Sequence, residues 1–390
     1  MKYKLEDICN RIYSGGTPST THKEYWNGDL PWLSSGETSQ RFVYTTEKFI
    51  TKEGVQKSST KYAKRNSIVM ASAGQGHTRG QVSFLMNDMY INQSVLVFEP
   101  EVSIVNPLYL YYNLDGRYEE LRQLSDGTST RGSLSGRIVK GMEIDLPNLS
   151  VQGKIVSVLY DIDKKIENNN QINRNLSEQA RSVYMETFGK FEKTKVLEDY
   201  PVKIYSGGTP STSKKEYWEG GDIHWLSSGE TANEFVTTTD KTITQLGVDN
   251  SSTKWASKYD VVTASAGQGH TRGQTTMILL NTCINQSVIV THAAKEYMPF
   301  IFFNLSGRYE ELRVLSDGTS TRGSLTTKIM AKLKMPDVTE NTIIKFSDYA
   351  WSAISQIEVN LKENEKLACL RDSLLLKLMT GEIDVSDLNI

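Results

Sequence analysis

The pattern of hydrophobic and polar positions divides the chain into two kinds of sequence. Runs such as NSIVMASA at 66–73 and QVSFLM at 81–86 are short, apolar and bounded by glycine-rich turns, which predicts strands joined by loops. From residue 155 onward, in contrast, apolar residues recur mostly at steps of three and four, which predicts a helix of about 35 residues and about 50 Å. Its apolar positions are Ile155, Val158, Leu159, Ile162, Ile166, Ile172, Leu176, Ala180 and Val183.

The same spacing predicts a second long helix near the end of the chain, with apolar positions at Ile354, Ile357, Leu361, Leu367, Leu370, Leu374 and Leu378. A domain of about 140 residues has a radius of gyration of only about 14 Å, so we expect the two helices to pair rather than only to pack on their own domains. Aligning Ile162 with Ile357 places Asn169 on Asn364, and a polar residue at such a position tends to fix register or orientation. The predicted contact positions of the helix pair are Ile162, Ile166, Asn169, Ile357, Leu361 and Asn364.

The strand-and-turn sequence occurs twice. KLEDICNRIYSGGTPST at 4–20 is matched by VLEDYPVKIYSGGTPST at 196–212, and GRYEELRQLSDGTSTRGSL at 116–134 is matched by GRYEELRVLSDGTSTRGSL at 307–325. ASAGQGHTRGQ is present without change at 71–81 and at 264–274. A repeat of about 190 residues is too long for a solenoid and indicates duplication of a whole domain.

We therefore predict an α+β protein in four parts. A mixed strand and helix domain spans 1–148 and is followed by a long helical region at 149–190. A second copy of the domain spans 191–337 and is followed by a second long helical region at 338–390.

Composition and charge limit the class of protein. Charged residues make up 23% and hydrophobic residues 38% of the 390 residues, as in folded proteins. The formal net charge of −2 does not decide whether DNA binds, because phosphate binding depends on the local arrangement of Lys and Arg. The sequence contains neither a long apolar run nor the start of a signal peptide, so we expect no membrane and a cytoplasmic location. Cys9, Cys283 and Cys369 are odd in number and far apart, which predicts reduced thiols.

The sequence carries no recognisable motif of a catalytic centre. GQGHTRGQ has the glycines of a nucleotide-binding loop, but it lacks the GK[ST] ending and precedes a predicted strand instead of a helix. The five histidines show no metal-ligand spacing, and the chain has no Glu-x-Lys triplet of the kind found in nucleases. We therefore expect no catalytic residue, no metal and no cofactor in this chain.

The repeated loops carry the residue types that bind DNA. Gln, His, Thr and Arg side chains read base edges or hold phosphates, and glycines let the backbone approach closely. The alternative is that these polar groups only satisfy one another within each loop. The predicted DNA-binding residues are Gln75, His77, Thr78, Arg79, Gln81, Thr130 and Arg131 in the first copy and Gln268, His270, Thr271, Arg272, Gln274, Thr321 and Arg322 in the second.

The order of these motifs resembles the specificity (S) subunit of Type I restriction-modification systems. The sequence runs from SGGTPS through PWLSSGE, the small-residue loop and INQSV to a long helix, and nearly all of it occurs twice. The helix endings LSEQARSVYMETFGKF at 176–191 and LRDSLLLKLMTGEIDV at 370–385 are similar to that family's conserved regions. The resemblance covers essentially the whole chain. It implies two target-recognition domains held apart by two long antiparallel helices that form a coiled coil, with a pseudo-twofold relation between the domains.

The same resemblance implies a non-catalytic subunit that binds double-stranded DNA and docks two adenine methyltransferase (M) subunits, with restriction (R) subunits as further partners. S-adenosylmethionine, ATP and Mg²⁺ are then expected on the partner subunits. Because the two domains are close copies, we predict a bipartite target with two near-identical inverted half-sites. Two alternatives are a coiled-coil adaptor that binds only protein and a self-sufficient DNA-modifying enzyme.

Overall fold

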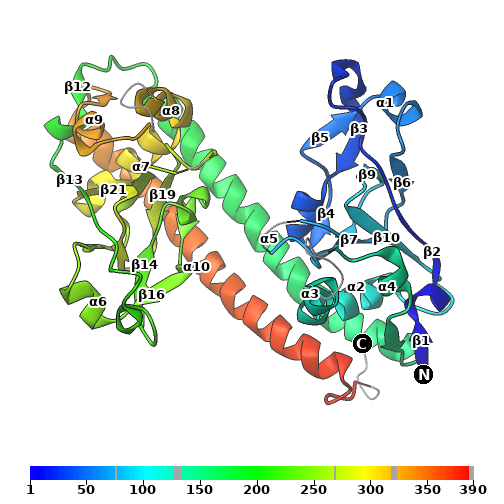
Figure 1. Cartoon of the computed structure of the whole chain (residues 1–390). Coiled ribbons are helices and arrows are strands. Elements are labelled where there is room, and N and C mark those ends of the chain that lie inside the picture. Colours follow the sequence, from blue (N-terminus) through cyan, green and yellow to red (C-terminus); the bar gives the residue numbers. More distant parts are fainter. Residues whose placement is uncertain (75–76, 127–132, 268, 318–322, 386–390) are drawn as a thin grey trace. The chain divides into compact units, whose positions relative to one another are not determined.

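The computed structural model describes residues 1–74, 77–126, 133–267, 269–317 and 323–385. The chain divides into two compact units, residues 1–165 with 367–390 and residues 166–366. Each unit holds one copy of the repeat together with parts of the two long helices, α5 (Leu149–Phe188) and α10 (Glu340–Met379) (Figure 1). The predicted α+β fold with two similar domains and two long helices is confirmed.

The first unit is built on two sheets. The five-stranded sheet has the order β2 (Cys9–Ser14), β10 (Val95–Pro100), β7 (Ile68–Ala71), β8 (Val82–Leu85) and β4 (Phe42–Val43). The four-stranded sheet has the order β5 (Lys48–Ile50), β3 (Trp26–Leu33), β9 (Met89–Ile91) and β6 (Lys61–Ala63). A short pair, β1 (Lys2–Lys4) with β11 (Glu143–Asp145), joins the start of the chain to the end of the domain.

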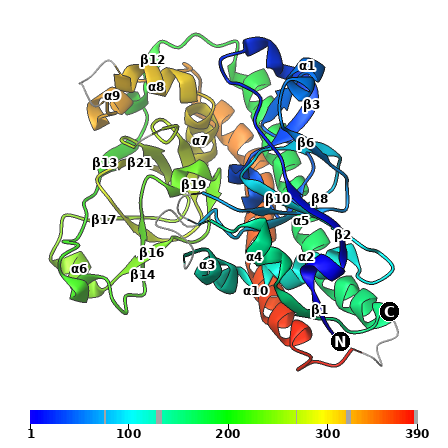
Figure 2. The ribbon, with the colours of Figure 1, turned by 45° about the vertical axis from the view of Figure 1, so that its right-hand side comes forward.

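Alternation along the central strand β7 explains the layers of this unit. Val69 packs in one apolar cluster with residues of the four-stranded sheet, such as Leu33 and Ile91. Its neighbours Ile68 and Met70 pack in a second cluster, which includes α2 (Pro107–Asp115) and α5. Helix α2 accordingly lies beside α5 in both views (Figures 1 and 2).

The second unit repeats this topology. Its five-stranded sheet has the order β13 (Val202–Ser206), β21 (Val288–Ala293), β18 (Val261–Ala264), β19 (Thr275–Ile278) and β15 (Phe235–Val236). Its four-stranded sheet has the order β16 (Lys241–Ile243), β14 (Ile223–Leu226), β20 (Thr282–Ile284) and β17 (Lys254–Ala256), and β12 (Lys195–Val196) pairs with β22 (Lys334–Met335). The sequence repeat is therefore a repeat of the fold.

The shorter α-helices also correspond between the units. The corresponding pairs are α1 (Lys52–Gln56) with α6 (Gln245–Asp249), α2 with α7 (Met298–Ser306), α3 (Tyr118–Asp126) with α8 (Tyr309–Asp317), and α4 (Gly136–Lys140) with α9 (Thr327–Ala331). Helix α2 begins at Pro107, because the Asn106 side chain accepts hydrogen bonds from the backbone N–H groups of Leu108 and Tyr109 and caps the first turn. None of the helices in the described ranges is both long and apolar enough to span a membrane.

The two long helices each span 40 residues. Helix α5 exceeds the predicted 35 because it begins at Leu149, where the Asn148 side chain accepts a hydrogen bond from the Val151 N–H and caps the first turn. One apolar residue of the predicted series, Ile172, is instead 45% exposed.

Asparagine pairs join α5 and α10 in the second unit. Asn169 Nδ2 donates to Asn364 Oδ1 at 2.9 Å, and Asn360 Nδ2 donates to Asn173 Oδ1 at 2.8 Å. The partner number falls as the number along α5 rises, so the helices run antiparallel. Asn169 is buried, and its amide is satisfied across the pair, as a buried polar group requires.

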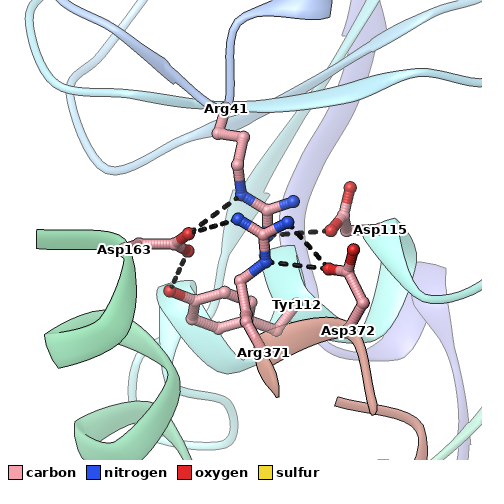
Figure 3. Close-up of polar contacts among 6 residues, drawn as sticks. All are labelled: Arg41, Tyr112, Asp115, Asp163, Arg371 and Asp372. Atoms are coloured by element: carbon pink, nitrogen blue, oxygen red, sulfur yellow. Dashed lines mark hydrogen bonds and ion pairs between the residues drawn. The ribbon is translucent and has the colours of Figure 1, made fainter. Parts of the chain in front are cut away.

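A buried ionic cluster links the first copy of the repeated domain to both long helices (Figure 3). Asp163 on α5 lies 2.8 Å from Arg371 Nη1 on α10 and 3.3 Å from Arg41 Nε. Its second oxygen accepts a hydrogen bond from the Tyr112 hydroxyl at 2.7 Å. Burial and the nearby Asp163 carboxylate raise the pKa of Tyr112 above its ordinary range, so the hydroxyl remains a donor.

The second copy has the opposite charge at the position of Arg41. Glu234 Oε1 lies 2.9 Å from Arg181 Nη2 and accepts a hydrogen bond from Ser177 Oγ at 2.6 Å. Arg181 and Ser177 are both on α5. Arg41 and Glu234 therefore each form an ion pair with a residue of opposite charge on a long helix.

We predict that Asp163→Ala destabilises the first unit. Removing the carboxylate leaves the guanidinium of Arg371, whose side chain is 10% exposed, without this partner, and breaking a buried ion pair from one side costs about 3 kcal/mol. Chemical denaturation of the whole chain measures the change in the free energy of unfolding. Asp161→Ala, two residues earlier on the exposed face of α5, is the matched control and should change it by less than about 0.5 kcal/mol. Equal effects of the two variants would contradict the role of Asp163.

Candidate nucleic-acid interface

The two copies of ASAGQGHTRGQ connect neighbouring antiparallel strands, as predicted. The first copy joins β7 to β8 and the second joins β18 to β19. Backbone hydrogen bonds close each loop at its base, from Ala71 N to Gln81 O and from Ala264 N to Gln274 O, both at 2.9 Å. The loops are therefore extensions of the central sheets.

A glycine near the end of each loop allows it to lie against the following helix. Gly80 and Gly273 have φ values of +87° and +85°, a conformation that favours glycine. A Cβ at Gly273 would lie 3.2 Å from the Leu312 Cβ on α8, and one at Gly80 would lie 3.4 Å from the Leu121 Cβ on α3. The positive φ favours glycine at both positions, and at Gly273 a side chain would also lie tightly against α8.

Helices α3 and α8 also hold the tips of the loops. The Tyr118 hydroxyl donates to His77 O at 2.7 Å, and the Tyr309 hydroxyl donates to His270 O at 2.8 Å. Arg313 Nη1 adds a hydrogen bond to Gly269 O at 2.6 Å. These bonds take up the histidine carbonyls, while both histidine side chains are exposed.

The predicted DNA-binding residues fall into three groups. The side chains of His77 and His270 are exposed, and those of Thr78, Gln81, Thr271 and Gln274 are half-buried. Gln75, Thr130, Arg131, Gln268, Thr321 and Arg322 lie outside the described residues. Arg79 and Arg272 form ion pairs with Asp126 and Asp317 at the ends of α3 and α8. Each loop thus combines exposed polar groups with an arginine already engaged by a carboxylate.

In the second unit this loop borders a polar cavity of about 530 Å³. His270 and Gln274 line one side, and Arg174 and Arg181 of α5 line another. Arg181 is bound to Glu234, and Arg174 is bound to Glu167 at 2.8 Å, so both cations already have acidic partners. Its lining thus includes both acidic and basic side chains together with neutral polar ones such as Ser177 and Thr231.

Sequence reasoning missed the residues that support the loops. Tyr118, Arg122 and Asp126, with Tyr309, Arg313 and Asp317 in the second copy, lie in the repeated stretch GRYEELR-x-LSD. Its identity in both copies was the available signal, because an exposed helix face needs no fixed tyrosine, arginine and aspartate at this spacing.

Two of the three cysteines, Cys9 and Cys283, are buried. Burial raises the pKa of the Cys9 thiol to about 12 and that of Cys283 to about 11, and no cysteine forms a disulfide. Within the described ranges, no three His, Cys, Asp or Glu side chains are grouped so that they could hold a metal ion.

Comparison with known proteins identifies the class. The family model of the Type I restriction modification DNA specificity domain matches residues 1–178 and 202–342. The chain therefore belongs to this family and carries two target-recognition domains. It is a specificity subunit, which has a non-catalytic role in a restriction-modification complex.

Individual relatives agree with this assignment. The Type I restriction enzyme MjaIX specificity subunit of Methanocaldococcus jannaschii is 26% identical, over 99% of this chain and 94% of that protein. The EcoR124I/EcoR124II specificity subunit of Escherichia coli is 29% identical over 42% of this chain and 41% of that protein. The crystal structure of the S subunit from M. genitalium has the same fold, with a TM-score of 0.57 and 16% identity over 97% of this chain and 95% of that one.

We predict that Gly273→Ala destabilises the second unit. Alanine in the left-handed conformation costs about 1–2 kcal/mol, and its methyl group would crowd α8. Thermal unfolding of the full chain measures the effect. Gly153→Ala provides a control of opposite sign, because this glycine lies within α5 with open space around it, and alanine there should stabilise the helix by about 0.5–1 kcal/mol. A neutral Gly273→Ala would mean that the loop can rearrange without cost.

Proposed function

We propose that this specificity subunit reads a bipartite DNA target with two near-identical half-sites in inverted orientation. The observation that carries the proposal is that the loop ASAGQGHTRGQ is identical in the two recognition domains and is supported alike in both, by the tyrosine of GRYEELR and by a tight glycine. The same side chains on the same backbone present the same donors and acceptors to a base pair, and so select the same bases.

Two of the positions at which the copies differ support this proposal. Arg41 and Glu234 contact α5, and Phe84 and Met277 are buried in the two domain cores. These differences do not alter the exposed groups of the loops. The antiparallel course of the helices that follow the two copies supports the inverted orientation of the half-sites.

The proposal includes the partners that modify or cut the DNA. Adenine methyltransferase subunits, two for each chain, dock on this subunit and carry S-adenosylmethionine, and restriction subunits with ATP and Mg²⁺ complete the assembly. Support comes from membership of the Type I restriction-modification family. Under this proposal the chain supplies DNA recognition and no chemistry of its own.

Methylome sequencing of a host that expresses the chain with its methyltransferase tests the target. We expect one methylated motif made of two inverted halves that agree at nearly every specified base, separated by a nonspecific spacer. Two unrelated halves would contradict the proposal. Methylation or cleavage by the purified chain alone would favour the self-sufficient enzyme.

Equivalent substitutions in the two loops should have equivalent effects. His77→Ala and His270→Ala are each expected to weaken binding of a duplex carrying the methylome-derived target, and to relax the same base position in opposite half-sites, at a cost of about 1–3 kcal/mol each. Fluorescence anisotropy at fixed salt measures the affinity, and methylome sequencing of the variants locates the relaxed base.

His22→Ala is the matched control, because His22 is also exposed but lies outside the loops and is bound to Glu24 at 2.8 Å. It should leave binding unchanged. If all three variants bind DNA like the parent chain, the loops are not the recognition site, and an adaptor that binds only protein becomes the better account.

A further inference from the structure

We propose that Arg79 and Arg272 are positioning residues that join the two recognition loops of each domain, and that DNA binding therefore requires their carboxylate partners, Asp126 and Asp317. The inference rests on the proposed function, since it assigns roles within the same DNA-binding surface. It also revises the interpretation of these arginines as direct DNA contacts.

Burial is the first argument. The side chains of Arg79 and Arg272 are only 12% and 14% exposed, whereas those of Asp126 and Asp317 are 60% and 59% exposed. Arg272 Nη2 lies 2.7 Å from Asp317 Oδ1, and Arg79 Nη2 is bonded to Asp126 Oδ1. The groups that face solvent in these pairs are thus the acids. A guanidinium that neutralises a DNA phosphate would need the more exposed position.

The surroundings of Arg272 give the second argument. A Cβ at Gly323 would lie 1.7 Å from Arg272 Nη1, so the guanidinium rests against the Gly323 backbone, where φ is +56°. Asp317 and Gly323 are the described residues on either side of segment 318–322. Arg272 therefore touches Asp317 and Gly323, two described residues of the second repeated loop, SDGTSTRGSL at 316–325.

Backbone hydrogen bonds at the same place give the third argument. Ser324 N donates to Ser316 O at 3.1 Å and closes the base of this second loop. Leu325 N donates to Ser265 O at 2.9 Å and ties it to the base of the first loop, and the first domain has the equivalent bond from Leu134 N to Ser72 O at 2.9 Å. The two loops share one base, and the arginine braces it with a charge-assisted bond.

The two possible roles of Asp126 and Asp317 predict opposite effects on DNA affinity when these aspartates are neutralised. An aspartate close to DNA repels phosphates, so neutralising it should tighten binding if its only effect is electrostatic. If the carboxylate instead holds the arginine that braces both loops, neutralising it leaves the loops to be ordered at the moment of binding, which weakens the complex.

The experiment uses the full chain and a duplex that carries the methylome-derived target. In the double variant Asp126→Asn, Asp317→Asn, we expect Kd to rise about tenfold, as when several side chains must be ordered on binding. Asp29→Asn, Asp222→Asn is the matched control, because it removes two exposed carboxylates at equivalent positions and changes the net charge equally. This control should bind as tightly as the parent chain or more tightly. An unchanged or lower Kd in the Asp126/Asp317 variant would overturn the proposal.

Hydrogen exchange without DNA provides an independent test. Arg272→Ala should speed exchange of the Ser324 and Leu325 amides, while thermal unfolding reports whether the chain still folds. Unaltered protection of these amides in a folded variant would overturn the positioning role. This test does not depend on DNA, so it separates the outcomes: failure of the histidine variants to affect binding would refute the loops as the recognition site, whereas unaltered exchange would refute the brace.

Discussion

The buried carboxylate of Asp163 is the interaction on which the first unit depends most. It is almost inaccessible to solvent, and it receives the guanidinium groups of Arg41 and Arg371 together with the hydroxyl of Tyr112. These groups come from the recognition domain and from α10, while Asp163 belongs to α5. An ionised carboxylate is tolerated at such a depth only when its oxygens are bonded, so domain and helices must meet in one geometry.

The second recognition domain contacts the two long helices through different residues. Its Glu234 binds Arg181 and Ser177 of α5, and its Tyr259 donates a hydrogen bond to Glu358 of α10 at 3.0 Å. Tyr259 has a φ of +77°, where the first domain has Asn66 at +65°. Asparagine tolerates this conformation well, whereas a tyrosine there is strained, so the strain is retained where the side chain makes a contact with a long helix.

The two sets of contacts are not interchangeable. Arg41 beside Arg181, or Glu234 beside Asp163, would oppose like charges in partly or fully buried surroundings. Two nearly identical domains in one chain could otherwise exchange places during folding, and like-charge juxtaposition is a recognised way to disfavour such alternatives. The charge reversal between the copies therefore matches each domain to its own contacts on α5.

Features that depend on residues close together in the sequence could be predicted, whereas contacts between distant residues could not. Duplication, the strands flanking each loop and the existence of the long helices follow from repeats and periodicity, which are local signals. The cap at Asn148 is also local, and it agrees with the start of the predicted helical region at 149. The ion pair between Arg79 and Asp126 joins residues 47 positions apart, and nothing in periodicity reports which cation meets which acid. Residue type predicts a DNA contact for Arg79, and the internal bond to Asp126 could not be read from the sequence.

The positions of the differences between the copies bear on how the subunit would distinguish the two halves of its target. Within the described ranges, the loops share the same exposed groups, the same tight glycines and the same bracing ion pair, while the contacts with the long helices are specific to each copy. Under the proposed function, both copies recognise DNA with the same groups, whereas each copy is attached to the long helices by different residues. Each domain can thus present the same groups to DNA although the two copies differ in their contacts with α5, because Arg41 and Glu234 both face that helix.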